Sequence, residues 1–152
     1  MQKGFRGNNR EVRALGTYVK LMRAAESVTS RVHKHLTAAG LSVSQFGVLE
    51  ALYHLGPLSQ RDLGQKILRS SGNITLVIDN LEKRGLVRRE RDRQDRRFFI
   101  VQLTDEGQKL IRKIFPLHAA LITREMSVLN AREQEILGNL CKKVGMGVNS
   151  RN

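Results

Sequence analysis

The sequence predicts a mainly α-helical fold that carries a small wing of two or three β-strands. Over most of the 152 residues, apolar side chains recur at spacings of three and four, which is the period of an amphipathic helix. Between residues 86 and 103 the pattern changes to two short apolar runs, Leu86-Val87 and FFIVQL, with the charged stretch RRERDRQDRR between them. Strands joined by such a tip form a hairpin.

The composition indicates a single domain, residues 1–152, with an anionic partner. Hydrophobic residues make up 40% of the chain, enough for a core, and Lys plus Arg number 27 against 14 Asp plus Glu, a net charge of +13. The excess is uneven, because residues 35–58 carry one charged side chain, Glu50, whereas residues 59–97 carry 11 basic and 6 acidic ones. Nucleic acid is the expected partner. A merely basic soluble protein is the open alternative.

The chain is expected to be cytoplasmic and to have no membrane partner. One cysteine, Cys141, excludes an intramolecular disulfide and fits a reducing compartment. The N-terminal MQKGFRGNNR has no apolar core of a signal peptide, and no apolar run reaches the ~18 residues of a membrane span.

The first three predicted helices are each bounded by capping and stop residues. A long helix covers about 11–39 and stops at Gly40. Ser44 is the expected cap of a second helix, which ends at Gly56-Pro57. Ser59 is the expected cap of a third, and Asp62 three residues later resembles a capping box.

A fourth helix is expected after the turn Ser70-Ser71-Gly72, running to about Arg84, with Gly85 in the left-handed position that ends it. After the hairpin, Thr104 can cap a fifth helix that extends to Leu129 and is kinked at Pro116. A last helix carries an apolar stripe from Ile136 to Val144.

The third and fourth helices with the hairpin behind them match a winged helix-turn-helix, in which the fourth helix is the recognition helix. Its apolar stripe is Ile74, Val77, Ile78 and Leu81, so the opposite face presents Asn73, Leu76, Asn80 and Lys83, with Ser71 and Thr75 at the flanks. Such residues can contact base edges, thymine methyls and phosphates. The alternative is an ordinary solvated face.

All the basic residues of the wing tip are arginines, which suit a narrow minor groove and bidentate phosphate contacts. Asp92 or Asp95 is expected to pair with some of them and stiffen the tip, leaving one or two arginines for DNA. A solvated charge run is the alternative here too.

The block from Ser59 to Ile111 resembles the MarR family of bacterial regulators, most strongly at LEKRGLV, at Asp95-Arg96-Arg97 and at LTDEG. The resemblance extends more weakly over nearly the whole chain. It implies an obligate homodimer, with dimerisation helices at about 11–39 and 105–145 and a winged-helix lobe at about 44–103. It also implies that Arg97 enters the minor groove and that Arg96 pairs with an acid or a phosphate. Leu76 departs from the family pattern, where many members have Arg or Lys, so the preferred DNA sequence does not carry over.

The residues expected to contact DNA, from the pattern and the resemblance together, are Ser59, Ser70, Ser71, Asn73, Thr75, Leu76, Asn80, Lys83, Arg88, Arg96 and Arg97.

Many relatives respond to a small aromatic or phenolic effector where the dimerisation helices meet the lobe, and the residues expected to line such a pocket are Met22, His35, Phe46, Leu49, Ile111 and Phe115. The alternative is that each belongs to the plain core, since a Met or Phe at helical spacing needs no ligand to explain it. Cys141 is expected to be a small buried hydrophobe rather than a thiol sensor, because it belongs to an apolar stripe. His33 and His35 are two residues apart and are expected on different faces of a helix, and His54 and His118 are isolated in sequence. They give no zinc motif, so neither a metal nor a cofactor is expected.

The sequence thus predicts a dimeric transcriptional regulator, a repressor of a pseudo-palindromic operator. An architectural DNA-binding protein without a small-molecule switch is the alternative, favoured by the net charge and by Leu76. An enzyme is not expected, since the chain has no Gly-rich phosphate loop, no HExxH and no CxxC.

Overall fold

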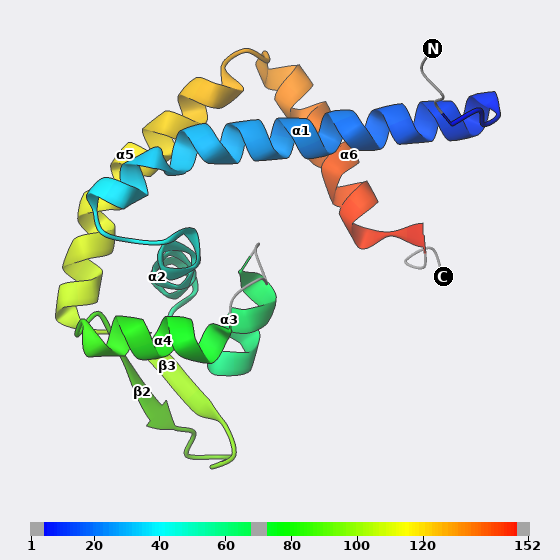
Figure 1. Cartoon of the computed structure of the whole chain (residues 1–152). Helices are drawn as coiled ribbons and strands as arrows, with labels where there is room; N and C mark the ends of the chain where they lie inside the picture. The colour runs from blue at the N-terminus through cyan, green and yellow to red at the C-terminus, as the bar shows by residue number, and fades with distance from the viewer. Residues whose placement is uncertain (1–4, 68–72, 149–152) are drawn as a thin grey trace.

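A computed structural model describes residues 5–67 and 73–148 of the chain (Figure 1). The helices are α1 (Asn9–Ala38), α2 (Val43–Leu55), α3 (Gln60–Lys66), α4 (Ile74–Lys83), α5 (Asp105–Met126) and α6 (Ala131–Met146), and the strands are β1 (Leu58–Ser59), β2 (Val87–Arg91) and β3 (Phe99–Leu103). Helices α2 to α4 and the sheet form a compact lobe, and α1 extends far beyond it. The mainly helical fold with a small sheet is confirmed.

Capping residues set the helix ends, and one predicted cap is wrong. Asn8 and Glu11 form a capping box at the start of α1, and Gly40 follows its end with a φ of +68°. Helix α2 is capped by Ser42, whose hydroxyl accepts from the Gln45 amide while the Gln45 side chain accepts in return. Ser44, the predicted cap, therefore lies inside the first turn of α2.

The other predicted caps of the lobe are confirmed. Ser59 accepts from the amide of Asp62, and Thr104 accepts from the amide of Gly107. Gly85 has a φ of +70° after α4. The fifth helix was predicted to extend to Leu129, but α5 ends at Met126, and Leu129 lies in the turn into α6. Figure 1 shows α5 bending along its length, as Pro116 predicts.

The sheet has three antiparallel strands in the order β1-β3-β2. In the hairpin, Val87 pairs with Leu103 and Arg91 with Phe99. The predicted wing of two or three strands has three, but the sequence does not predict the position of β1, because its pattern assigns Leu58 and Ser59 to the start of the third helix. Leu58 pairs with Val101, which fastens the helix-turn-helix to the base of the wing.

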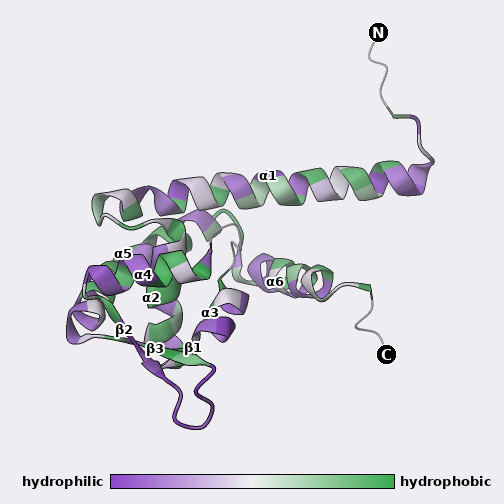
Figure 2. Cartoon of the chain, turned by 60° about the horizontal axis from the view of Figure 1, so that its bottom comes forward, coloured by the Kyte–Doolittle hydropathy of each residue, from purple (hydrophilic) through white to green (hydrophobic). Residues whose placement is uncertain are grey.

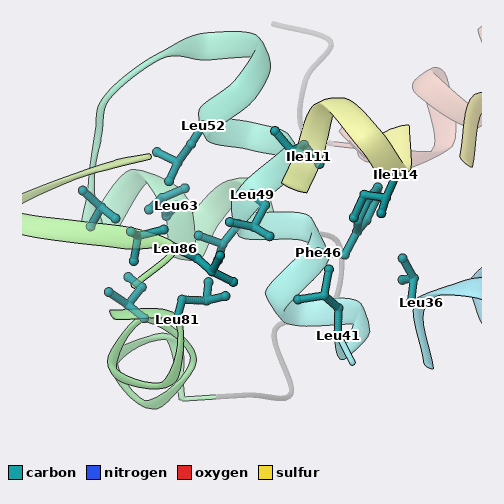
Figure 3. Packing of buried hydrophobic residues seen from close by; sticks show 14 residues of the cluster. Leu36, Leu41, Phe46, Leu49, Leu52, Leu63, Leu81, Leu86, Ile111 and Ile114 are labelled. Atoms are coloured by element: carbon teal, nitrogen blue, oxygen red, sulfur yellow. The ribbon is translucent and has the colours of Figure 1, made fainter. Parts of the chain in front are cut away.

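The core of the lobe joins all its elements (Figure 3). Phe46 and Leu49 of α2 pack in the same cluster as Leu81 of α4 and Ile111 of α5, and each is at most 2% exposed. The predicted inward stripe of α4 is confirmed at Ile78 and Leu81, which are fully buried, whereas Ile74 and Val77 are half-buried. The removal of these apolar side chains from water stabilises the folded lobe.

The structure explains why the last residue of the LTDEG motif, Gly107, is a glycine. A Cβ atom on Gly107 would lie 2.0 Å from the carbonyl oxygen of Leu86, closer than any side chain allows. The same Leu86 oxygen accepts from the Thr104 amide. Glycine at this position therefore lets the first turn of α5 pack directly on the start of the wing.

Three histidines meet where α1 crosses α5. The His118 ring of α5 lies 5.9 Å from His33 and 5.3 Å from His35 between ring centroids, and it packs on Phe46 at 4.4 Å. Burial, with the neighbouring His35 and His33 adding to it, lowers the pKa of His118 to about 4. About two turns further along α5, Glu125 pairs with Arg31 of α1 at 2.6 Å. These contacts join α1 to α5 at the top of the lobe.

The N-terminal part of α1 and the whole of α6 bury nothing within the chain. Residues 9–20 are exposed, and α6 has no buried residue among those described. Figure 2 shows hydrophobic positions recurring along both helices where no other element covers them. Cys141 is exposed with the rest of α6, so its predicted burial is not found within one chain. Among the described residues, no helix is long and apolar enough to cross a bilayer.

Candidate nucleic-acid interface and adjoining groove

The helix-turn-helix is held together by polar contacts at the start of its second helix. Gln60 of α3 donates to the Thr75 hydroxyl at 2.8 Å. Asn73 is the N-cap of α4 and accepts from the Thr75 amide at 3.0 Å. Asn73 was expected on the outer face of the recognition helix, but its side-chain oxygen is used to start that helix. Ser70 and Ser71 lie outside the described residues.

The outer face of α4 is available to a partner. Leu76 is 57% exposed, and Thr75, Asn80 and Lys83 are exposed beside it. The opposite face carries the buried Ile78 and Leu81, so the orientation predicted from the apolar stripe is found. An exposed leucine between polar residues gives this face an apolar centre that can contact thymine methyls.

At the wing tip, Asp95 holds Arg97. The guanidinium of Arg97 donates to Asp95 through Nε at 3.0 Å and through Nη2 at 2.7 Å, and the Arg97 amide donates to the same carboxylate at 3.1 Å. Hydrogen bonds from Arg97 hold the pKa of Asp95 below its usual value. The Arg97 side chain nevertheless stays 84% exposed, so it remains accessible from solvent while it contacts Asp95.

The other tip residues divide into backbone supports and exposed cations. Asp92 accepts from the Gln94 amide at 2.9 Å, and so shapes the turn. Arg91 donates to the Arg96 carbonyl at 2.8 Å and lies over the Phe99 ring. Arg96 itself is exposed, and Arg88 contacts Glu90 loosely at 3.6 Å. Of the two predicted bracing acids, Asp95 contacts an arginine side chain and Asp92 contacts the backbone.

Arg89 fastens the wing to the recognition helix, a role that sequence reasoning missed. Its guanidinium pairs with Asp79 at 2.5 Å and with Glu82 at 3.2 Å, both on α4, and its amide donates to Glu82 at 3.1 Å. The Arg89 side chain is 21% exposed, less than those of the acids it joins. The available signal was the spacing of Asp79 and Glu82, three apart on one edge of α4.

Behind the interface, α1, α2 and the end of α3 enclose a groove of about 860 Å³. Met22 and Phe46 from the predicted pocket line it. Leu49 and Ile111 do not line it and lie in the core of the lobe, to which Phe46 also belongs. His35 and Phe115 are half-buried and do not line the groove; the His35 ring lies near Phe46 and the Phe115 ring near His118. The groove instead takes its remaining lining from residues that were not predicted: Ala25, Glu26, Thr29, His33, Val43, Gly47, Glu50, Ala51, His54, Leu55, Lys66 and Ile67.

Comparison with known proteins agrees with this geometry. The sequence profile of the MarR family matches residues 41–98. The chain is 40% identical over 134 residues to the HTH-type transcriptional regulator MhqR of Bacillus subtilis strain 168, covering 88% of this chain and 92% of that protein.

Two solved structures have the same fold. Sco3205, a MarR family regulator from Streptomyces coelicolor in complex with DNA, superposes with a TM-score of 0.82 at 23% identity, over 99% of this chain and 95% of that one. BpsR of Bordetella bronchiseptica, whose DNA binding is regulated by 6-hydroxynicotinic acid, gives a TM-score of 0.76 at 25% identity, over 86% and 98%. Regulators of this family bind DNA and act as dimers, some with small-molecule effectors. With the winged helix, the exposed recognition face and these relatives taken together, the chain belongs to the MarR family and is a DNA-binding transcriptional regulator.

Proposed function

We propose that the chain is a homodimeric repressor that binds a pseudo-palindromic operator and is released by a small aromatic effector in the groove between α1 and α2. The single observation that carries the DNA-binding part is the pairing of an exposed α4 face with a wing whose Arg97 is held outward by Asp95. Both features lie on the side of the lobe away from α1 (Figure 1). The proposed place of action is the cytoplasm.

The proposed dimer is formed by the arms, α1 with the later part of α5 and α6. On α1, Val12, Leu15, Val19 and Met22 form an apolar stripe that is 40–54% exposed. Helix α6 has a capping box at Asn130 and Glu133 but no buried residue. Most of the stability of a helix in a protein comes from packing its apolar face, and α6 buries none of its residues against the described part of the chain, so a second chain is the natural cover.

On DNA, each winged helix would occupy one half-site, with half-site centres about 10 bp apart. We assign the major groove to Thr75, Leu76 and Asn80, and the minor groove to Arg97. The proposed phosphate contacts come from Ser59, Ser70, Ser71, Lys83, Arg88 and Arg96. Asn73 acts here by fixing the start of α4, since its oxygen already caps that helix.

The groove supports an effector site by its size and position. A volume of about 860 Å³ falls within the usual range for small-molecule sites. Its walls come from α1, which we place in the dimer interface, and from α2 of the lobe. A ligand between them could bias the angle between arm and lobe, and with it the spacing of the two recognition helices. The regulation of BpsR by a small aromatic molecule supports this reading.

The test is fluorescence anisotropy with a duplex from the protein's own promoter region and with a scrambled duplex of equal length, each at several salt concentrations. A repressor of this kind that touches about 6–10 phosphates should lose affinity by about 10³- to 10⁵-fold between 50 and 200 mM salt. It should also prefer the promoter duplex by about 10³-fold or more. Salt-insensitive binding would contradict the proposed interface. Equal affinity for both duplexes would favour the architectural alternative, to which the exposed Leu76 is suited.

A further inference from the structure

The groove between α1 and α2 has a charge that contrasts with the rest of the molecule. The chain carries a net charge of +13, yet the groove is lined by two carboxylates, Glu26 and Glu50, and one ammonium, Lys66. Glu50 is half-buried on α2, whereas Lys66 is exposed in the last turn of α3. Solvent screens an exposed charge more than a half-buried one, so the carboxylate of Glu50 dominates the groove.

The shape of the groove is set by small and flat side chains. Ala25 of α1 and Gly47 and Ala51 of α2 all line the groove, and side chains this small leave its space open. Phe46 and Ile67 supply apolar walls. A flat ring fits between such walls, and its substituents would then meet the polar residues at the edge.

We propose that this groove selects an aromatic ligand that bears hydrogen-bond donors and no negative charge, and that it disfavours aromatic carboxylates. The proposal rests on the effector site proposed above and specifies the ligand class of that site. The N–H or O–H groups of the ligand donate to the carboxylates of Glu50 and Glu26. A ligand carboxylate would instead add a third negative charge to a partly desolvated site.

The environment of Glu50 supports this assignment. Burial raises the pKa of Glu50, although the nearby His54 acts in the opposite direction. A carboxylate whose hydration is restricted gains more from a donor than a fully hydrated one does, because it has less water to give up. His54, one turn along α2, can pair with the same carboxylate when no ligand is present.

The experiment uses the full chain and three probes of nearly identical shape, namely benzamidine, benzamide and benzoate. They carry a positive charge, no charge and a negative charge on the same ring, so that differences in affinity report the electrostatics of the groove. Binding is measured by ligand-observed NMR titration for the wild type, Glu50→Gln and Glu26→Gln. Glu106→Gln, on the exposed first turn of α5, is the matched control.

Benzamidine and benzamide are expected to bind at least tenfold tighter than benzoate. Either groove substitution should reduce the advantage of benzamidine over benzamide severalfold, and Glu106→Gln should leave it unchanged. If benzoate binds best and Lys66→Met abolishes that preference, the ligand class is wrong although the effector groove stands. If none of the probes binds more weakly to an Ala25→Leu variant, whose added side chain fills the groove, the effector site itself is wrong and this inference falls with it.

Discussion

At the scale of single residues, Arg97 depends on Asp95 for its direction. Because the carboxylate accepts from both the backbone and the guanidinium of Arg97, the side chain extends from the tip in one orientation. Arg97→Ala should lower DNA affinity about tenfold to hundredfold and reduce the salt slope by about one. Asp95→Asn should lower affinity less, with the slope unchanged, since the cation remains. Anisotropy titrations at four salt concentrations measure both quantities. Tighter binding by Asp95→Asn would mean that the carboxylate competes with DNA for Arg97.

A second residue-scale prediction concerns pH and His118. In the unfolded chain this imidazole takes up a proton near its ordinary pKa of 6.5, whereas in the folded chain burial lowers the pKa to about 4. As pH falls from about 6.5 to 4, the unfolded state therefore binds more protons and the free energy of unfolding decreases. Urea unfolding should show a steeper decrease for the wild type than for His118→Asn. His54→Asn, at an exposed position, is the control. Equal slopes in the wild type and His118→Asn would place the acid sensitivity elsewhere.

At the scale of secondary-structure elements, the sequence predicts most of the lobe because each helix carries its own stop signals. Thr104 and Gly85 act through local backbone geometry, which a pattern can reveal. Strand β1 has two residues, and only its pairing with β3 makes it a strand. Ser42 and Ser44 both precede an apolar run, and the side chain of Gln45 decides in favour of Ser42.

The groove was harder to predict than the interface, because periodicity shows which side chains point inward but not whether they meet atoms or space. Leu49 and Ile111 follow the same helical spacing of apolar residues as Phe46 and Met22, yet they are fully buried in the core and do not line the groove. The small residues opposite one another on α1 and α2 were the informative signal, and pairing them requires the tertiary structure. The three histidines come together for the same reason, across more than 80 residues of sequence.

The wing and the recognition helix form one unit through Arg89, and this makes an element-scale prediction. Arg89→Gln should lower DNA affinity about tenfold, since the wing loses its fixed position relative to α4. The salt slope should stay unchanged because Arg89 faces Asp79 and Glu82 rather than solvent. Arg88→Ala is the matched comparison one residue away, and it should reduce the slope by about one.

The Asp79→Asn variant should lower DNA affinity in the same way. The double variant Asp79→Asn with Arg89→Gln should lose less binding free energy than the sum of the losses in the two single variants. Salt-dependent anisotropy on all four proteins measures this coupling. A slope that falls by about one in Arg89→Gln would mean instead that Arg89 contacts a phosphate.

At the scale of the whole molecule, two helices, α1 and α6, leave their apolar stripes exposed in a single chain. The lobe has a closed core, but α6 presents Ile136, Leu137, Leu140 and Val144 to solvent, each 42–64% exposed. These residues form one stripe, and Cys141 lies next to it. An apolar stripe of this kind on a well-capped helix indicates an interface with another protein chain rather than a surface that stays in contact with water. Cys141, which was expected to be buried, would then be covered by the second chain. The length of α1 has the same explanation, because its exposed N-terminal part would also pack against that chain.

Leu140→Glu should therefore dissociate the dimer, because each chain then places one charge in the apolar interface and the dimer gains two. We expect the dimer dissociation constant to rise at least about thirtyfold, and the melting temperature to fall and to depend more strongly on protein concentration. Lys142→Glu, two residues away on the opposite face of α6, is the control for charge and should leave the dimer intact. Sedimentation equilibrium gives the association state, and anisotropy on the promoter duplex gives the consequence, since a monomer engages only one half-site. A wild-type chain that sediments as a monomer at micromolar concentration, or two variants that behave alike, would exclude α6 from the interface.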